Sequence, residues 1–335
     1  MKIIDTPFAN TAELQKMLVA TGRISAHAHL TEFTGGVSSL AALVVDRDDE
    51  WVVKSPLRRL SVDDVWIASR ERGANEAAIL EFLDGRLGPI RVPRLRFFDS
   101  THIILGEEFI LGPPPTYKDL LLCGAPQPEV AAALGIAITH LHSQEPPERL
   151  AGDGPRQLFR ELRLEAYYET TAQQLDQQSD ALYTLIHDTL AAQRTLVHGD
   201  LTPKNVLVAP SGPVLVDWEV IHLGDPAFDL GTVIAHLILK AIREPSMSTT
   251  KLIVDDARQF LSSYNGPADR RRAFRHAGAI MLARLFGKSR VEYLSEEGLR
   301  VEAQKVGVMA LQDDNWDLEN LEEVMVNPSD DRDLS

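Results

Sequence analysis

The residues most able to do chemistry lie between positions 198 and 219, on two short loops that each follow an apolar run. Asp200 is followed five positions later by Asn205, and Asp217 comes after a second apolar run. A carboxylate such as Asp200 can orient and deprotonate a hydroxyl group, while an amide and a second carboxylate can hold Mg²⁺ ions that neutralise a transferring phosphoryl group. This order and spacing predict phosphoryl transfer, with Asp200 as the base and Asn205 and Asp217 as metal ligands. The alternative is a structural β-hairpin with polar loops.

Neighbouring residues are predicted to support this block and not to react. His198 is expected to bond the backbone near Asp217. Asp225 precedes Pro226, which suits the first position of a helix, so Asp225 is expected to cap that helix. Asp229 lies in the first turn, where it either interacts with the helix dipole or reaches back to backbone N–H groups that hold the catalytic loop. Its expected role is structural in both cases.

A glycine-containing turn lies upstream, between two strand-like runs. Glycine lets backbone N–H groups approach anions closely, so this turn could cover the phosphates of a nucleotide. A turn of this kind is otherwise an ordinary hairpin connection. The residues assigned to nucleotide binding there are Gly35, Gly36, Ser38 and Ser39.

Lys54 ends the strand-like run after this turn, where a lysine could pair with phosphates. Such a lysine needs a carboxylate to hold it in place. Glu76 precedes Ile79, Leu80 and Leu83 by three, four and seven positions, so it should face the sheet with them. Lys54 and Glu76 are therefore predicted to pair at the nucleotide site, although an isolated strand-end lysine would be solvated.

Apolar periodicity and breakers divide the chain into a strand-rich part and a helical part. The expected fold class is α+β with two lobes. Residues 1–111 form a β-rich nucleotide-binding lobe with a hinge, 112–312 form a mainly helical lobe with the catalytic site, and 313–335 form an acidic tail. The predicted strands are 30–33, 40–45, 51–54, 92–98, 102–105, 195–197, 206–208 and 214–216, and the predicted helices are 75–83, 130–141, 158–167, 228–242, 251–264, 268–287 and 295–311.

The charge of the chain is concentrated at its end. The net charge is −15, and the segment 313–335 carries nine acidic residues and one basic residue, so it is expected to be solvated and partly disordered. An acidic balance argues against nucleic-acid binding. No run of apolar residues is long enough for a membrane span, and no secretory signal is visible. The single cysteine, Cys123, excludes an internal disulfide and indicates the reducing cytoplasm. It has no His or Asn context that would suggest a nucleophile, so it is expected to be a small buried side chain.

Together these residues resemble the aminoglycoside phosphotransferase and choline kinase family, the small-molecule branch of the protein-kinase-like fold. The resemblance covers most of the chain. Its most specific part is His198–Asp200 with Asn205 and Asp217–Glu219, while the glycine turn matches loosely. The resemblance implies a two-lobed protein-kinase-like fold, ATP and Mg²⁺ as cofactors, and a small-molecule hydroxyl group as acceptor.

The resemblance also assigns roles to residues outside the catalytic block, which is the segment 198–219. Lys54 is expected to pair with the ATP phosphates, and the backbone of Glu107–Ile110 is expected to bond the adenine. Glu108 and Ile110 are therefore assigned to nucleotide binding. Glu219 stands where protein kinases carry glycine, and it is assigned either as a ligand near the metal or as the ion-pair partner of a basic residue.

The length of the segment after Asp217, the residue of the predicted metal loop, distinguishes protein kinases from the small-molecule branch of this fold. Only residues 218–224 lie between Asp217 and Asp225, too few for a phosphorylatable activation segment, which argues against a protein kinase. A nucleotide-binding protein without kinase activity is a further alternative. The joint presence of Lys54 and the catalytic block argues against it.

The acceptor is not defined by the sequence. An aminoglycoside, a choline-like amine and a sugar such as methylthioribose stay open, the last disfavoured by Gly224–Pro226. Glu161, Glu165 and Glu169 recur every four residues and could line a cation-binding wall. A solvated helix face is the more common role for such spacing.

Overall fold

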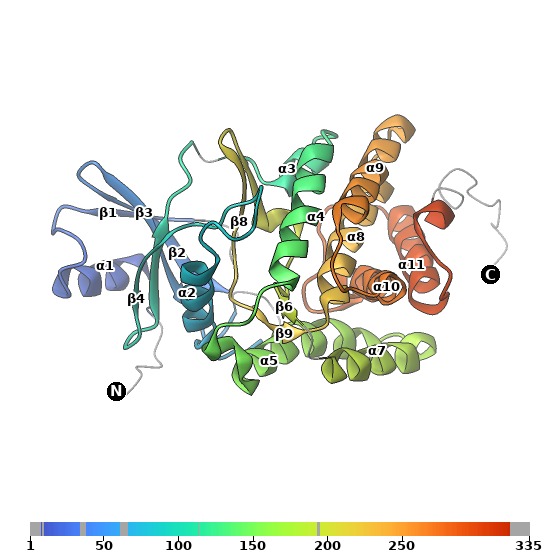
Figure 1. Cartoon of the computed structure of the whole chain (residues 1–335), viewed down its shortest axis with the longest axis horizontal. Coiled ribbons are helices and arrows are strands. Elements are labelled where there is room, and N and C mark those ends of the chain that lie inside the picture. The colour runs from blue at the N-terminus through green and yellow to red at the C-terminus, as the bar shows by residue number, and fades with distance from the viewer. Residues whose placement is uncertain are drawn as a thin grey trace.

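The computed structural model describes residues 8, 10–33, 38–60, 66–112, 114–192 and 195–321. A lobe built on a sheet and a larger helical lobe lie side by side along the long axis of the molecule (Figure 1). The chain crosses from the first lobe to the second between β5 (Ile104–Glu108) and α3 (Tyr117–Leu122). The predicted two-lobed α+β fold is confirmed.

The small lobe is built on a five-stranded antiparallel sheet with the order β1-β2-β3-β5-β4. Because side chains alternate along a strand, one face of the sheet buries Ala42, Val44 and Trp51. Leu14 and Leu18 of the first helix pack against the same face. Besides β5, the sheet and its first helix consist of α1 (Thr11–Ala20), β1 (His29–Glu32), β2 (Ser39–Asp46), β3 (Asp49–Pro56) and β4 (Leu95–Asp99).

The helix α2 (Arg72–Leu83) lies against β3, β4 and β5. Its apolar stripe of Ile79, Leu80 and Leu83 is at most 1% exposed. Glu76 shares that buried side and is 3% exposed. The predicted inward direction of Glu76 is therefore confirmed, and the helix carries a carboxylate to the sheet.

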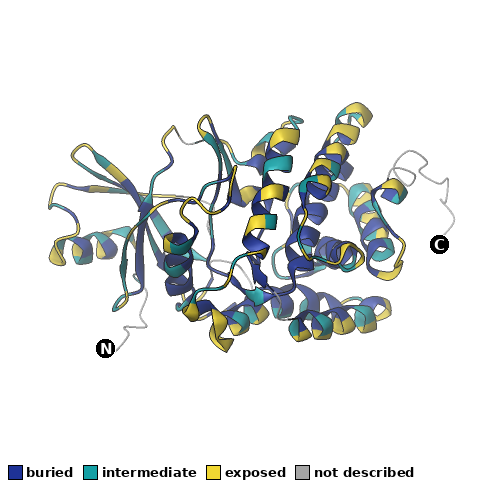
Figure 2. Cartoon of the chain, viewed as in Figure 1, coloured by how far each residue is buried: buried dark blue, intermediate teal, exposed yellow. Residues whose placement is uncertain are grey.

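The large lobe packs around one apolar helix, α8 (Pro226–Arg243), which is buried along most of its length (Figure 2). Asp225 accepts a hydrogen bond from the Ala227 N–H, and Pro226 occupies the first turn, as predicted. The helices that surround α8 or follow it are α4 (Pro128–His142), α9 (Met247–Ser263), α10 (Arg270–Phe286) and α11 (Glu297–Gln312).

A group of short helices follows α4 in the chain and lies along the lower side of the large lobe in Figure 1. Its central member, η2 (Arg160–Glu169), is a π-helix. The wider turn of a π-helix disturbs the usual three- and four-residue spacing, which explains the irregular pattern of the predicted helix 158–167. The other members are η1 (Glu148–Ala151), α5 (Asp153–Phe159), α6 (Thr170–Ala172), η3 (Asp176–Gln178) and α7 (Ser179–Ala191).

Two small antiparallel ribbons carry the catalytic block. One pairs β6 (Thr195–Val197) with β9 (His222–Gly224), and the other pairs β7 (Val206–Ala209) with β8 (Gly212–Leu215). The short helical turn η4 (Pro203–Asn205) connects the first ribbon to the second. The predicted strands at these positions are present, and β9 is an additional strand that the sequence did not reveal.

Two further differences from the sequence predictions concern helices and Cys123. The helices α1, α3 and α7 were not predicted. Cys123, expected to be buried, is exposed at the C-cap of α3. In the described part of the chain, no helix is both long and apolar enough to cross a membrane.

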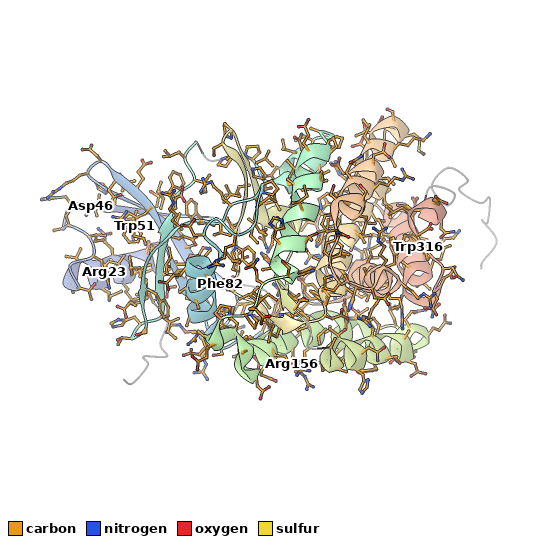
Figure 3. The ribbon with its side chains drawn as sticks, viewed as in Figure 1. Arg23, Asp46, Trp51, Phe82, Arg156 and Trp316 are labelled. Carbon is orange, nitrogen blue, oxygen red and sulfur yellow. The ribbon has the colours of Figure 1, made fainter. Side chains whose placement is uncertain are left out.

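The acidic C-terminal segment begins as packed structure. Trp316, Leu318 and Leu321 are at most 6% exposed and join the core of the large lobe. The Trp316 ring, labelled in Figure 3, lies 5.5 Å from the Phe274 ring of α10. The expected solvation therefore does not hold for these three residues, although Asp313, Asp314 and Asn315 are exposed. Residues 322–335 lie outside the described part.

Trp316→Ala is expected to lower the free energy of unfolding by about 3–5 kcal/mol, because it leaves a cavity beside α10. Chemical denaturation of the full chain measures this loss. Asn315→Ala, at an exposed neighbouring position, serves as the control and should change stability by less than about 1 kcal/mol. Equal stability of the two variants would show that the segment does not contribute to the fold.

Candidate active site

A buried carboxylate accepts hydrogen bonds from the backbone of the loop that carries Asp200. Asp229, in the first turn of α8, accepts hydrogen bonds from the N–H groups of His198 (2.8 Å) and Gly199 (3.0 Å). His142 lies 3.3 Å from the same carboxylate and is itself 2.8 Å from the Tyr264 hydroxyl. Asp229 has the second of the two roles considered for it, as a structural support of the catalytic loop.

Gly199 is required by the shape of this loop. Its φ of +76° lies in the left-handed region, and a Cβ there would approach the Val220 carbonyl oxygen to 2.9 Å. His198 is fully buried and its Nδ1 accepts a hydrogen bond from the Asp200 N–H. The turn therefore fixes the backbone from which the Asp200 side chain projects.

Asp200 is 4% exposed and is surrounded by donors. The Asn205 amide donates to its Oδ2 at 3.0 Å, Arg163 lies at 3.1 Å and Lys204 at 3.5 Å. Burial alone would raise the pKa of this carboxyl group, but Arg163 and Lys204 lower it to about 2. Asp200 is thus an ionised carboxylate whose lone pairs are aimed by its neighbours.

Arg163 is a part of the site that the sequence did not reveal. It projects from the π-helix η2, is 7% exposed, and also donates from Nε to the Gly199 carbonyl oxygen at 2.9 Å. One side chain therefore holds both the catalytic loop and its carboxylate. Its only sequence signal is a basic residue between Leu162 and Leu164, which is weak.

Arg163→Met is expected to raise the pKa of Asp200, because the cation that stabilises the charged carboxylate is lost. The acid limb of the pH profile of kcat should then move upward by about 1–3 pH units. Arg160→Met, on the same helix but half-exposed and paired with Glu165, is the control and should leave the profile unchanged. Identical profiles for the two variants would remove Arg163 from the positioning of Asp200.

The second carboxylate of the block, Asp217, has a φ of +67°. Few residues other than glycine adopt this conformation, and aspartate is among the more tolerant. The Val216 N–H donates to the Asn205 carbonyl oxygen at 2.9 Å, which joins the backbones of the two predicted metal-binding loops. The Trp218 N–H lies 3.4 Å from Glu76 Oε1, so this loop also meets α2.

Lys54 lies between two carboxylates. Its Nζ is 2.9 Å from Glu76 and 2.8 Å from Glu107. Burial alone would lower the pKa of Lys54, but Glu107 and Glu76 raise it well above its usual value. The predicted Lys54–Glu76 contact is present, while the contact with Glu107 was not anticipated. Burial raises the pKa of Glu76 to about 7, with Glu107 and Asp217 adding to the rise.

Glu219 forms an ion pair with Arg72, whose Nε lies 3.0 Å from the carboxylate. Both side chains are almost fully buried. Arg72 also donates to the carbonyl oxygens of Ser38 and Leu57, so it connects the metal loop to the strand that follows the glycine turn. Of the two roles considered for Glu219, the structure shows the ion pair.

The glycine turn is only partly visible. Gly35 and Gly36 lie outside the described residues. Ser38 precedes β2 and Ser39 begins it. The Ser38 carbonyl bond to Arg72 is the observed link between this end of the sheet and the site.

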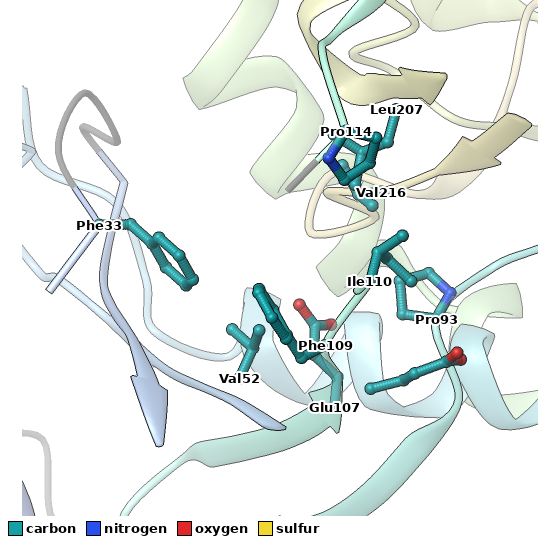
Figure 4. Close-up of a pocket in the computed structure, with 10 residues that line it drawn as sticks. Phe33, Val52, Pro93, Glu107, Phe109, Ile110, Pro114, Leu207 and Val216 are labelled. Atoms are coloured by element: carbon teal, nitrogen blue, oxygen red, sulfur yellow. The ribbon is translucent and has the colours of Figure 1, made fainter. Parts of the chain in front are cut away.

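A cavity of about 180 Å³ opens where the two lobes meet (Figure 4). Phe33 and Val52 line it from the small lobe, while Leu207 and Val216 line it from the large lobe. Glu108 and Ile110 border it, as expected for a nucleotide site at the hinge. The Glu108 side chain is held by Arg91 at 2.9 Å, and the Glu108 N–H donates to the Arg94 carbonyl oxygen at 2.9 Å. The remaining lining residues are Pro93, Glu107, Phe109 and Pro114.

The acidic stripe of η2 is engaged by side chains of η2 and of the preceding helix α5. Arg160 lies 3.1 Å from Glu165 and 3.8 Å from Glu169, and Gln157 donates to Glu161. These pairs fit the solvated helix face considered above.

The sequence pattern of the phosphotransferase enzyme family matches residues 29–247, more than half of the chain. The chain belongs to this family. The matched range takes in Lys54, the catalytic block and the support at Asp229. Members of the family are phosphotransferases, so the protein is an enzyme of that class, as the sequence resemblance predicted. No curated protein sequence matches the chain.

Solved structures of small-molecule kinases share the fold of this phosphotransferase. The choline kinase of Streptococcus pneumoniae superposes with a TM-score of 0.54 at 16% identity, over 90% of this chain and 98% of that one. The ethanolamine kinase of Plasmodium vivax gives 0.51 at 11% identity, over 96% and 90%. A spectinomycin phosphotransferase in complex with ADP and spectinomycin gives 0.50 at 14% identity, over 94% and 93%. These likenesses show the protein-kinase-like fold.

Proposed function

We propose that this phosphotransferase moves the γ-phosphate of ATP, with Mg²⁺, to a hydroxyl group of a small molecule. The observation that carries the proposal is the convergence of Asp200, Asn205 and Asp217 on two joined loops, with Lys54 held beside them on the sheet. The ADP-bound spectinomycin phosphotransferase of the same fold supports a nucleotide donor. With one exposed cysteine and ATP as the donor, we also place the reaction in the cytoplasm.

The catalytic role of Asp200 would be to orient the acceptor hydroxyl and to receive its proton as the phosphoryl group is transferred. A carboxylate with a pKa of about 2 is a weak base, so its main contribution is orientation, with proton transfer late in the step. Lys54 would offset phosphate charge, held in place by Glu76. Lys204, half-exposed beside Asp200, could reach the transferred group.

The donors at the metal loops fit Mg²⁺. The Asn205 amide nitrogen bonds Asp200, which leaves its amide oxygen available as a ligand, and Asp217 supplies a carboxylate. Among the described residues, no cluster of three or more acidic, histidine or cysteine side chains could hold a metal alone. This suits Mg²⁺, which takes one or two protein ligands and completes its shell with phosphates and water. When bound, it neutralises charge on the phosphates.

The charges around Asp200 favour a neutral or anionic acceptor over a polycation. Arg163 and Lys204 both lie directly on the carboxylate. The Tyr167 ring lies 5.7 Å from the Arg163 guanidinium and 5.9 Å from that of Arg284, which adds a second cation near Tyr167. A polycationic acceptor would be repelled here, whereas a sugar or a hydroxy acid would not.

ATP consumption measured across aminoglycosides, amino alcohols, sugars and hydroxy acids tests both parts of the proposal. We expect turnover with at least one small molecule, abolished when EDTA removes Mg²⁺, and higher kcat/KM for neutral or anionic acceptors. Nucleotide binding without turnover on any acceptor would favour the alternative of an inactive nucleotide-binding protein. Preferred use of a polycation would contradict the charge argument.

A further inference from the structure

A buried carboxylate with one free oxygen borders the cavity between the lobes. Glu107 is 4% exposed, and its Oε1 lies 2.8 Å from Lys54 Nζ. Its Oε2 has no hydrogen-bond partner among the residues that the structure describes. The labelled side chains around it in Figure 4 are mostly apolar. A buried acceptor without a partner is costly, so a ligand that fills the cavity should bring a donor to it.

Only one oxygen of this carboxylate can serve a ligand, because Lys54 occupies the other. Adenine carries an amino group at position 6, which offers one N–H to a single acceptor and keeps another for a second acceptor. Guanine carries two adjacent donors, at N1 and at the 2-amino group, which match a carboxylate with both oxygens free. Its 6-oxo group would also be repelled by the carboxylate.

The other polar group on this wall also fits adenine. Within the described chain, the Ile110 N–H donates no hydrogen bond, and Ile110 borders the same cavity as Glu107. Adenine places a ring nitrogen acceptor next to its amino group, so one edge of the base can meet both Glu107 and Ile110.

We propose that Glu107 is a specificity-determining residue that selects 6-aminopurine nucleotides over 6-oxopurine nucleotides. The proposal rests on the proposed function, because it takes the cavity as the site of the nucleotide base. The Glu107 carboxylate accepts a hydrogen bond from the 6-amino group of the base, and Lys54 determines which of its two oxygens faces the base.

Calorimetric binding of nucleotides with Mg²⁺ tests this without knowledge of the acceptor. For the unmodified protein, ATP should bind at least about 10-fold more tightly than GTP and than the triphosphate of unsubstituted purine riboside, which lacks the 6-amino group. This comparison needs no variant. Equal binding of the three nucleotides, or tighter binding of GTP, would overturn the proposal while leaving nucleotide binding established.

Glu107→Gln sharpens the test. Lys54 should draw the amide oxygen toward itself, so the amide NH₂ would face the base and turn an acceptor into a donor. The ratio of GTP to ATP affinity should then rise at least about 10-fold. Glu50→Gln, the same change at an exposed position of β3, is the control and should leave the ratio unchanged. An unchanged ratio in a folded Glu107→Gln would overturn the role of Glu107, and no binding of any nucleotide would overturn the proposed function with it.

Discussion

Replacement of Asp200 with asparagine is expected to lower kcat by about 10²–10⁴-fold while the affinity for ATP changes little. The amide cannot accept the proton of the acceptor hydroxyl, and it offers a donor where Arg163 and Asn205 already donate. Steady-state turnover and calorimetric nucleotide binding measure the two quantities separately. Alanine at this position should lose as much activity, with an additional loss of stability because buried Arg163 is left without its partner.

The control for this prediction is Asp180→Asn, the same change at an exposed position of α7. It should keep the activity of the unmodified protein. Turnover of Asp200→Asn close to that of Asp180→Asn would remove Asp200 from the reaction. Loss of ATP binding in the same variant would assign it to the nucleotide site instead.

Asp229→Ala is expected to lower the free energy of unfolding by about 2–5 kcal/mol, because it leaves the buried N–H groups of His198 and Gly199 without an acceptor. The side chain is fully buried, so water would not readily replace it. Urea denaturation measures the loss. Turnover should fall as well, even where the variant is folded, because the loop that carries Asp200 is no longer held.

Asp269→Ala provides the matched control, since Asp269 also accepts a backbone N–H, at the exposed N-terminus of α10. Loss of such a cap costs about 1 kcal/mol, and activity should not change. If Asp229→Ala cost no more than Asp269→Ala, the buried carboxylate would not be the support of the loop.

Short-range spacing was sufficient to predict that the loops of Asp200, Asn205 and Asp217 lie together. Asp200, Asn205 and Asp217 lie close together in the sequence, within residues 200–217, so the chain already limits their separation. Lys54 and Glu76 are farther apart, but each sits on a regular element whose buried side can be read from its apolar stripe. Where the chemistry follows local periodicity, the sequence predicted the contact.

The contacts that were missed come from elements whose placement is not local. Arg163 reaches Asp200 only because η2 is a π-helix packed under the catalytic loop, and neither its widened turn nor its packing follows from spacing. Glu107 was expected to contribute its backbone to adenine binding, and only the pairing of β3 with β5 brings its side chain to Lys54. In the segment 313–335, the high negative charge led to a prediction of solvation, although Trp316 packs into the core of the large lobe.

The central claim, transfer of a γ-phosphate to a small-molecule hydroxyl group at Asp200, is tested most directly by phosphorus NMR of a reaction with ATP, Mg²⁺ and the best acceptor of the panel. We expect a new phosphomonoester resonance that grows in equal amount with ADP and is absent with Asp200→Asn. Formation of inorganic phosphate in place of the ester, or the same ester yield from the Asp200→Asn variant, would contradict it.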